Sequence, residues 1–454
     1  MISIVRLTEK LFNKFFPSPF TIAVILTLVV FLLALLLTEQ SYTKIITGWE
    51  KGLWNSSLLS FTTQMMLMLV LGHSVALTKF ANSIISLITR FCKDTASSVF
   101  FISFFSILVS FLNWGLGLIF GAILAKKVGE NLARNRVKIN YPLFGAAGYC
   151  GLMVWHGGLS GSAPLKIAEA GHLRDLVTDD KLLKILPNNI DFSNTVFSNM
   201  NLFVSGFLLL LIPLLFYIIA KVSNKESDLN INLKSFENKK INTKKKYFAE
   251  KIDESNLIGT LFGGIILILS FKKIIFSSSL DFINPNFINF SLLGLALFLH
   301  SNFKDFLNSI NEAIKGVSGI LIQFPLYFGI MGIMTSSGLV YVFSDFFTSI
   351  SSEFTYPIYT MISAGIVNIF VPSGGGQWAV QAPIILQVAN ELNVSFEKTI
   401  MAFVYGDQLT NMLQPFWALP LLGITGLKAR QILPYSMLIM LGGMTIFLFG
   451  IIIF

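Results

Sequence analysis

Eleven long apolar stretches run through this chain of 454 residues, and they restrict what it can fold into. A helix needs about 20 apolar residues to cross the hydrocarbon core of a bilayer. Only 13% of the residues are charged, whereas soluble domains carry about 25%. The composition excludes a disordered chain and an ordinary soluble enzyme, and it predicts an all-helical polytopic membrane protein. The stretches are 19–37, 57–77, 98–125, 141–165, 197–220, 257–276, 286–301, 316–341, 356–390, 398–425 and 431–454.

A basic segment divides the chain into two halves. Residues 221–256 contain nine lysines and six acidic residues with little apolar periodicity, which is typical of a solvated loop. We therefore expect one membrane half at 1–220, a cytoplasmic loop at 221–256 and a second membrane half at 257–454. The chain has 33 Lys and Arg against 24 Asp and Glu. In a membrane protein this excess indicates basic cytoplasmic loops rather than nucleic-acid binding.

Two of the stretches do not fit a simple crossing. Basic residues flank 98–125 on both sides, so both of its ends favour the cytoplasm. The stretch 356–390 is too long for one crossing and too short for two, and a proline with three glycines should break its helix near the middle. We predict two re-entrant helical hairpins, the first entering from inside and the second from outside. The alternative is that both stretches are plain crossings with irregular centres.

The distribution of charge supports the hairpins and sets the orientation. With the N-terminus inside and both hairpins in place, inner segments hold 24 of the 33 Lys and Arg residues, and outer segments hold the other 9. No basic residue then remains in the membrane, and Asp407 is the one acidic residue that does. We expect a multi-pass protein of the cytoplasmic membrane with a cytoplasmic N-terminus.

The two halves follow the same order of elements in opposite orientations. Each has a crossing, a hairpin with an asparagine near its tip, a polar or glycine-rich crossing and a further crossing. This is the inverted-repeat arrangement of secondary transporters. Identical residues at offsets of 255 or 256 are few, among them Asn113 with Asn368 and Tyr149 with Tyr405. The topology therefore carries this prediction more than the identities do.

The hairpin tips are the predicted transport site. Irregular backbone survives at membrane depth only where it is buried in protein or faces a wet cavity. The helix after each tip, expected to start near Leu118 and near Trp378, points its N-terminus at the centre and favours an anion there. Exposed carbonyl and amide oxygens of the preceding arms suit a small hard cation. The predicted substrate contacts are Asn113, Gly115, Ser373, Gly374, Gly375, Gly376 and Gln377, although three glycines also suit a tight packing bend.

Asp407 is the strongest candidate for an ion-coupling group. A carboxylate inside a membrane costs about 2.5–3.5 kcal/mol on insertion scales, which makes it a functional candidate by default. Asp407 could carry a proton or bind Na+, with Asn113 and Asn368 as further coupling residues. Thr410 and Asn411 follow it by one turn and are predicted to contact substrate. A structural hydrogen bond to a broken helix is the alternative role for Asp407.

His156 and Ser160 lie four residues apart in a glycine-rich segment. Such a pair permits a Ser–His nucleophile, but the G-x-S-x-G motif is absent and the sequence supplies no orienting acid. We favour a cavity-lining His156 that contacts substrate over an enzyme. The two cysteines also lack metal-ligand spacing, so we expect no bound cofactor beyond a coupling ion.

Three strings resemble a known family. The strings VPSGGGQWAVQAP (371–383) and GDQLTNMLQPFW (406–417) are similar to signatures of the short-chain fatty acid transporter family, and NWGLG (113–117) is similar to its first hairpin tip. The resemblance spans nearly the whole chain. It implies a carrier of short monocarboxylates such as butyrate or acetoacetate in the cytoplasmic membrane. It also implies an elevator-type motion within a two-hairpin superfamily of ion symporters, often as homodimers.

The residues agree with this implication and leave alternatives. With no basic residue in the membrane, a small anion must be held by N–H groups, hydroxyls and a co-bound cation, which predicts coupling to Na+ or H+ and disfavours anions of higher charge. The alternatives are a carrier of another small anion, such as a dicarboxylate or an amino acid, and a cation/proton antiporter in which Asp407 acts alone. The expected partners are the substrate, the lipid bilayer and a second copy of the chain.

Overall fold

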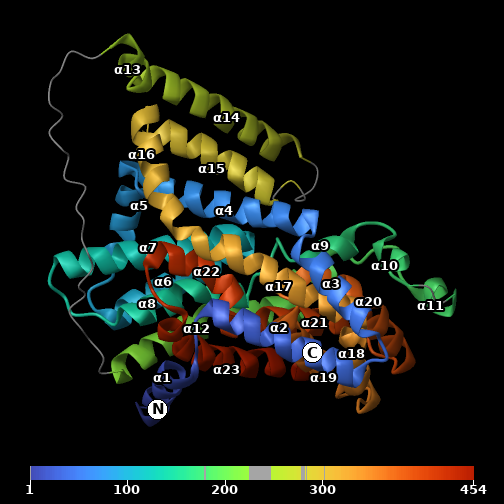
Figure 1. The fold of residues 1–454 in the computed structure, drawn as a ribbon. Coiled ribbons are helices and arrows are strands. Elements are labelled where there is room, and N and C mark those ends of the chain that lie inside the picture. Colours follow the sequence, from blue (N-terminus) through green and yellow to red (C-terminus); the bar gives the residue numbers. More distant parts are fainter. Residues whose placement is uncertain (1, 178–179, 224–246, 278–281, 283, 301) are drawn as a thin grey trace.

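The computed structural model describes the chain except residues 1, 178–179, 224–246, 278–281, 283 and 301. In the described part, every regular element is a helix (Figure 1). The N-terminal half contains α1 (Ile2–Phe15), α2 (Pro19–Leu37), α3 (Tyr42–Leu53), α4 (Ser56–Ala76), α5 (Lys79–Thr89), α6 (Thr95–Leu112), α7 (Trp114–Arg134), α8 (Tyr141–Tyr149), η1 (Cys150–Met153), α9 (Ser162–Ala168), α10 (His172–Asp175), α11 (Asp180–Ile185), η2 (Phe192–Asn194) and α12 (Asn199–Val222). The C-terminal half contains α13 (Phe248–Asp253), α14 (Asn256–Phe276), α15 (Pro285–His300), α16 (Phe303–Ala313), η3 (Ile314–Gly316), α17 (Ser318–Ser337), α18 (Leu339–Ser349), α19 (Tyr356–Phe370), α20 (Gly374–Glu391), α21 (Phe396–Thr410), η4 (Asn411–Leu413), α22 (Pro415–Thr425) and α23 (Ala429–Ile453).

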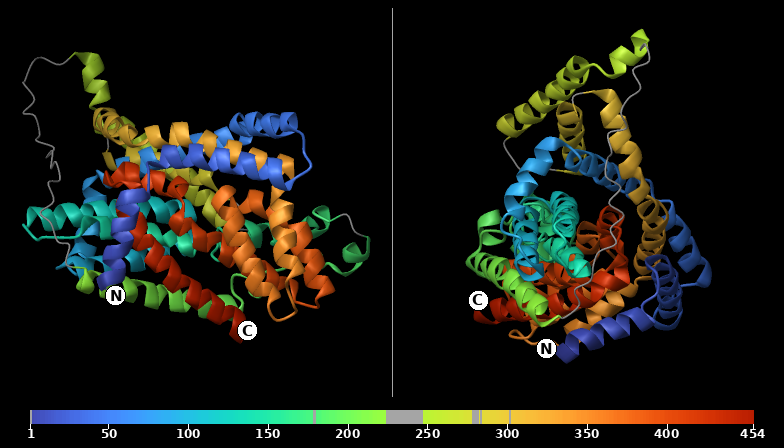
Figure 2. Two further views of the ribbon diagram at one scale, coloured as in Figure 1. Left: turned by 60° about the horizontal axis from the view of Figure 1, so that its bottom comes forward. Right: turned by 90° about the vertical axis from the view of Figure 1, so that its left-hand side faces the viewer.

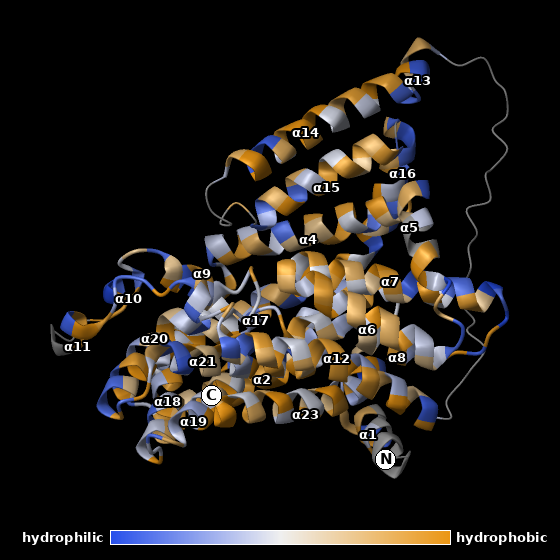
Figure 3. Cartoon of the chain, turned by 180° about the vertical axis from the view of Figure 1, so that it is seen from behind, coloured by the Kyte–Doolittle hydropathy of each residue, from blue (hydrophilic) through white to orange (hydrophobic). Residues whose placement is uncertain are grey.

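The prediction of a polytopic helical membrane protein is confirmed at this level. Among the described residues, seven helical runs are long and apolar enough to cross a membrane. Hydrophilic residues gather at the end with α10 and α11 and at the opposite end with the α7–α8 connection, with hydrophobic residues between them (Figure 3). The predicted stretch 19–37 coincides with α2. The seven runs are α2, the run Tyr42–Ala76 through α3 and α4, α6, α12, α14, α17 and α23.

Three predicted crossings are not continuous helices. In the stretch 141–165, the α-helix ends at Tyr149. It is followed by η1 and an irregular loop, and the next α-helix begins at Ser162. The stretch 398–425 is interrupted by η4, and Pro415 then begins α22 at a position where its missing N–H costs nothing. The stretch 316–341 is divided at Gly338, whose φ of 77° ends α17.

Both predicted hairpin stretches break as expected, but at earlier positions. The helix after the first break starts at Trp114 rather than near Leu118, because the Asn113 side chain accepts a hydrogen bond from the Leu116 N–H and caps it. The second break covers residues 371–373, and the three glycines do not cause it. Pro372 ends the regular backbone, Ser373 caps α20 through the Gly376 N–H, and the glycines form the first turn of α20.

The same order of elements occurs in both halves. The broken pair α6–α7 is followed by α8, η1 and α9, and the broken pair α19–α20 is followed by α21, η4 and α22. Close backbone approaches hold each set together. A Cβ atom on Gly121 of α7 would lie 2.1 Å from the Gly148 carbonyl oxygen of α8, and one on Gly406 of α21 would lie 2.0 Å from the Met361 carbonyl oxygen of α19. Only glycine permits such contacts.

The helices form a central body with a layer on one side. Helices α14 and α15 lie on the far side of α4 from α6 and α7, as Figures 1 and 2 show. Helix α15 packs on α4, and α4 contacts α7. The segment 166–196 contains the short helices α10, α11 and η2 beside the end of α9. Most of the predicted loop 221–256 lies outside the described residues, and α13 follows it.

Candidate functional site

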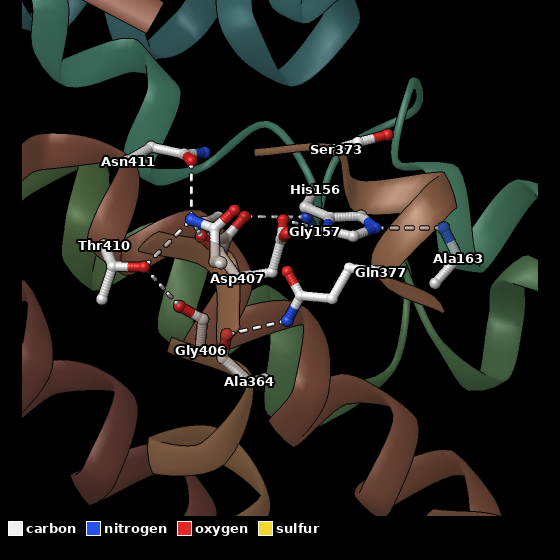
Figure 4. A network of polar contacts seen from close by, with 12 residues as sticks. His156, Gly157, Ala163, Ala364, Ser373, Gln377, Gly406, Asp407, Thr410 and Asn411 are labelled. Carbon is white, nitrogen blue, oxygen red and sulfur yellow. Dashed lines mark hydrogen bonds and ion pairs between the residues drawn. The ribbon is translucent and has the colours of Figure 1, made fainter. Parts of the chain in front are cut away.

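The loop between η1 and α9 brings His156 to Asp407 on α21. The His156 Nδ1 and Asp407 Oδ2 atoms are 2.5 Å apart, and both side chains are buried. The backbone N–H of Ala163 donates to His156 Nε2 at 3.0 Å. Because Nε2 accepts, the imidazole proton lies on Nδ1 and faces the Asp407 carboxylate (Figure 4). The pair therefore holds a proton between two buried side chains.

Asn368 fastens the end of α19 to α21 and η4. Its Nδ2 atom lies 2.6 Å from the Asp407 carbonyl oxygen, 2.9 Å from Thr410 Oγ1 and 2.9 Å from Asn411 Oδ1. Thr410 in turn donates to the Gly365 carbonyl at 2.9 Å. Four of the predicted site residues, namely Asn368, Asp407, Thr410 and Asn411, thus form one network. Gln414, which the sequence analysis did not select, joins it by donating to the Asn368 carbonyl.

Within the described part of the chain, several buried oxygen atoms of this region have no hydrogen-bond donor. They are Oδ1 of Asp407, Oδ1 of Asn368, Oε1 of Gln377 and Oε1 of Gln414. The Gln377 amide nitrogen donates to the Ala364 carbonyl and to Gln381, which turns its oxygen toward the Asp407 carboxylate (Figure 4). Buried acceptors without donors are costly. A proton or an oxygen-ligated cation is the kind of partner that would satisfy them.

A transition-metal site has no support in this region. Among the described residues, no group of three His, Cys, Asp or Glu side chains could hold a metal ion. The oxygens are one carboxylate and three amides, which are hard ligands. This donor set fits Na+ or a proton, and it does not fit zinc or iron.

The first turn of α20 has an open position at Gly375. Among the described residues, the N–H groups of Gly374 and Gly375 have no protein acceptor. A Cβ on Gly374 would lie 2.8 Å from His156 Cε1, so Gly374 packs tightly. A Cβ on Gly375 would meet nothing closer than 3.6 Å. The positive end of α20 and the Ser373 hydroxyl are therefore available to an anion beside the His156–Asp407 pair.

The α6–α7 tip reaches this network through Trp155. The Trp114 N–H donates to Ser160 Oγ at 3.0 Å, and the Trp114 ring lies 6.0 Å from that of Trp155. Trp155 stacks on His156 with 4.5 Å between ring centroids. Asn113 and Gly115 therefore lie at a separate tip, and none of the hydrogen bonds that the structure describes joins them to Asp407.

The Ser160–His156 pair needed for an enzyme is not assembled. Ser160 accepts from the Trp114 N–H, and His156 Nε2 is occupied by the Ala163 N–H. Asp407 does orient His156, a relationship that the sequence could not supply. In the described contacts, however, no serine hydroxyl meets the imidazole as a nucleophile would.

Sequence reasoning missed several polar residues that position the loop. Gln408 accepts a hydrogen bond from the Gly157 N–H at 2.9 Å, and Asn201 of α12 donates to the Gly157 carbonyl at 2.8 Å.

A further contact that the sequence did not indicate joins α20 to α10. Trp378 Nε1 donates to His172 Nε2 at 3.2 Å. Their signal was a polar side chain in an apolar stretch, or membership of one of the signature strings.

Comparisons with known proteins give a family. The model of the family described as "Short chain fatty acid transporter" matches residues 1–454. A protein of Escherichia coli (strain K12) named "Putative short-chain fatty acid transporter" is 32% identical over 454 residues, which is 99% of each chain. One of the same name from Haemophilus influenzae is 32% identical over 453 residues, 98% of each chain.

Two solved structures are similar at low identity. One is MtrF of Neisseria gonorrhoeae, whose structure is described as illuminating a class of antimetabolite efflux pumps. It is 16% identical with a TM-score of 0.42, covering 98% of this chain and 96% of that one. The other is the YdaH transporter of Alcanivorax borkumensis, 14% identical with a TM-score of 0.43, covering 96% and 98%.

Proposed function

The chain belongs to the short-chain fatty acid transporter family, and we propose that it carries short monocarboxylates such as butyrate and acetoacetate across the cytoplasmic membrane by cation symport. Family membership makes it a transport protein rather than an enzyme. The observation that supports symport most is the buried His156–Asp407 pair next to the free N–H groups of α20. An anion site and a cation-binding carboxylate then lie in one place.

The anion part of the proposal uses α20. The substrate carboxylate would accept from the N–H groups of Gly374 and Gly375 and from the Ser373 hydroxyl. Gly376 already donates to Ser373, and the Gln377 amide nitrogen donates to the Ala364 carbonyl, so neither N–H is free for the substrate. In the proposed topology, no Lys or Arg lies in the membrane. A single negative charge is the charge that such a site can hold.

The cation part uses Asp407. In one form, Na+ binds Asp407 Oδ1 together with the amide oxygens of Asn368, Gln377 and Gln414 that lack donors. In the other form, a proton on Asp407 Oδ1 donates to one of those oxygens. Na+ would satisfy all four of these oxygens, whereas the proton would satisfy Asp407 Oδ1 and the one amide oxygen that accepts from it. Both forms neutralise the carboxylate before an anion enters. Asn113 and Gly115 lie at the separate α6–α7 tip, so we propose no contact between them and the substrate at this site.

The motion is proposed to be of the elevator type. The broken pairs α6–α7 and α19–α20 would be re-entrant hairpins that enter from opposite sides, related by an inverted repeat. The repeated order of elements supports this. The outer layer with α4, α14, α15 and α17 would stay fixed while the body that carries Asp407 moves. The N-terminus would be cytoplasmic, and the assembly would be a homodimer by family resemblance.

One second function has a specific observation behind it. The His156–Asp407 pair and the unsatisfied oxygens could also serve cation/proton exchange with no organic substrate. A carrier of a dicarboxylate or an amino acid is the remaining alternative.

Substrate counterflow separates these functions without any assumption about coupling. Proteoliposomes loaded with unlabelled butyrate should take up labelled butyrate transiently, and acetoacetate inside or outside should compete. Succinate and neutral amino acids should not compete. If correctly inserted protein shows no counterflow of any monocarboxylate, the proposed substrate class is wrong. Cation-driven proton movement in the same vesicles without butyrate would then identify an antiporter.

A further inference from the structure

A large apolar cavity lies away from the His156–Asp407 pair. Its volume is about 610 Å³. Leu112, Asn113 and Leu116 at the α6–α7 tip line one side, and α14 and α15 line the other with residues such as Phe271 and Leu292. The volume is within the range of about 300–1,000 Å³ that ligand pockets occupy. It is far more than the tail of a four-carbon acid would fill.

Asn113 is the polar group at the inner wall of this cavity. The residue is 4% exposed, and its Oδ1 atom is used to cap α7 through the Leu116 N–H. Among the described residues, its Nδ2 atom has no acceptor. This free amide donor borders an apolar space at the positive end of a 21-residue helix. A compact, negatively charged head group on one aliphatic chain fits both features.

The other polar groups of the lining argue against a more polar ligand. Ser270 Oγ donates to the Ile266 carbonyl at 3.0 Å, and Ser291 Oγ donates to Ser270 Oγ at 3.2 Å. These hydroxyls are engaged within the α14–α15 pair, so the ligand meets mainly methyl, methylene and aromatic groups. A membrane lipid chain is the alternative occupant of the cavity, and the dependence of binding on the carboxylate separates the two.

We propose that this cavity binds an aliphatic monocarboxylate of medium chain length, such as decanoate, with the carboxylate at Asn113 Nδ2 and the tail between α14 and α15. The ligand would link the α6–α7 tip to the α14–α15 layer. Its effect on transport rests on the proposed function: if the tip moves against that layer, the bound acid arrests the motion and inhibits carriage of butyrate. Binding itself does not depend on what the protein transports.

Binding of labelled decanoate to the purified full chain in lipid nanodiscs tests the site directly. Protein-free nanodiscs measure the partition of decanoate into lipid. Leu292→Trp should fill the cavity and weaken binding by about tenfold or more, which corresponds to about 1.4 kcal/mol. The matched control is Leu261→Trp on α14, because Leu261 is 57% exposed and is not part of the cavity lining. The control should bind decanoate as the native chain does.

The head-group contact has its own test. Asn113→Asp keeps the oxygen that caps α7 but removes the amide donor and adds a negative charge, so decanoate binding should fall as it does in Leu292→Trp. Decanol, which lacks the carboxylate, should bind the native chain at least about tenfold more weakly than decanoate. Equal binding of decanol and decanoate, or decanoate binding that Leu292→Trp leaves unchanged, would overturn the proposal and leave a lipid chain as the occupant.

Counterflow then separates the two proposals. Decanoate should lower the maximal rate of butyrate exchange without changing its apparent KM, and Leu292→Trp should remove this inhibition while native exchange persists. A parallel change in the butyrate KM of Leu292→Trp would place the cavity in the transport site and contradict a separate site. Decanoate binding without any butyrate exchange would sustain the cavity site and reject the proposed substrate.

Discussion

His156 Nδ1 and Asp407 Oδ2 lie 2.5 Å apart although 251 positions separate the two residues in the chain. The contact joins the irregular loop before α9 to the middle of the signature string on α21, and both side chains are fully buried. It gives the acidic residue of the membrane region a partner whose tautomer is set by the Ala163 N–H. Cation coupling and the stability of this region both depend on this pair.

Asp407→Asn should separate exchange from accumulation. The amide keeps the shape of the site but cannot bind a proton and is a weaker cation ligand. Butyrate counterflow should persist, whereas accumulation driven by the coupling cation should fall to the level without a gradient. Both are measured in the same proteoliposomes. Unchanged gradient-driven accumulation would remove Asp407 from the coupling role.

His156→Ala should destabilise the protein. It leaves the buried Asp407 carboxylate without the imidazole N–H that donates to it, and an unsatisfied buried acceptor costs about 1–3 kcal/mol, more when it is charged. The thermal unfolding midpoint in detergent should fall. Adding Asp407→Asn to His156→Ala should recover part of this loss, because the neutral amide is cheaper to bury. The pairing would be contradicted if the double variant lost more stability than the two single variants lose together.

Neighbouring glycines of α20 should respond differently to substitution. Gly375→Val places a side chain in open space where the substrate carboxylate is proposed to lie, so uptake should be lost while the unfolding midpoint stays near the native value. Gly374→Ala drives a Cβ into His156 and Trp155, so it should lower stability by about 1–3 kcal/mol. Normal uptake by Gly375→Val would reject the anion site.

Acid should loosen the contact between α10 and α20. Burial, and then the charge of Lys166, lower the pKa of His172 below its ordinary value, although Glu169 and Asp175 act in the opposite direction. As the pH falls below about 6.5 the unfolded chain binds the proton first, so stability declines with falling pH. Protonation also removes the acceptor of Trp378 Nε1.

His172→Gln provides the matched variant for this prediction. Glutamine can still accept from Trp378 but does not titrate. The fall of the unfolding midpoint between neutral pH and mild acid should therefore be smaller in the variant than in the native chain. Identical pH profiles would show that His172 does not carry the effect.

Cysteine labelling tests the proposed topology. The native Cys92 and Cys150 are buried, so they should react little with a charged maleimide. Lys138→Cys, at an exposed position after α7, should react only from the cytoplasmic side, and Glu391→Cys, at the exposed end of α20, only from outside. Labelling of both from one side would contradict hairpins that enter from opposite sides.

Local chemistry made much of the fold predictable from the sequence. Apolar length located most helices, and Asn113 and Pro372 marked both breaks because capping and the missing proline N–H act within one turn. Asp407 stood out because a carboxylate is costly in a membrane. Its partner did not, since the approach of His156 depends on tertiary packing of the loop before α9. The sequence likewise could not distinguish the packed Gly374 from the open Gly375, or place Asn113 at a cavity shared with α14 and α15.

The most direct test of the account is the accumulation of labelled butyrate in proteoliposomes with an inward Na+ gradient, an inward proton gradient or neither. The account predicts accumulation above equilibrium with one of the two gradients, and its suppression by excess acetoacetate. The active gradient would identify the ion that Asp407 binds. Uptake that is the same under all three conditions, from protein whose insertion has been verified, would contradict cation-coupled transport of short monocarboxylates.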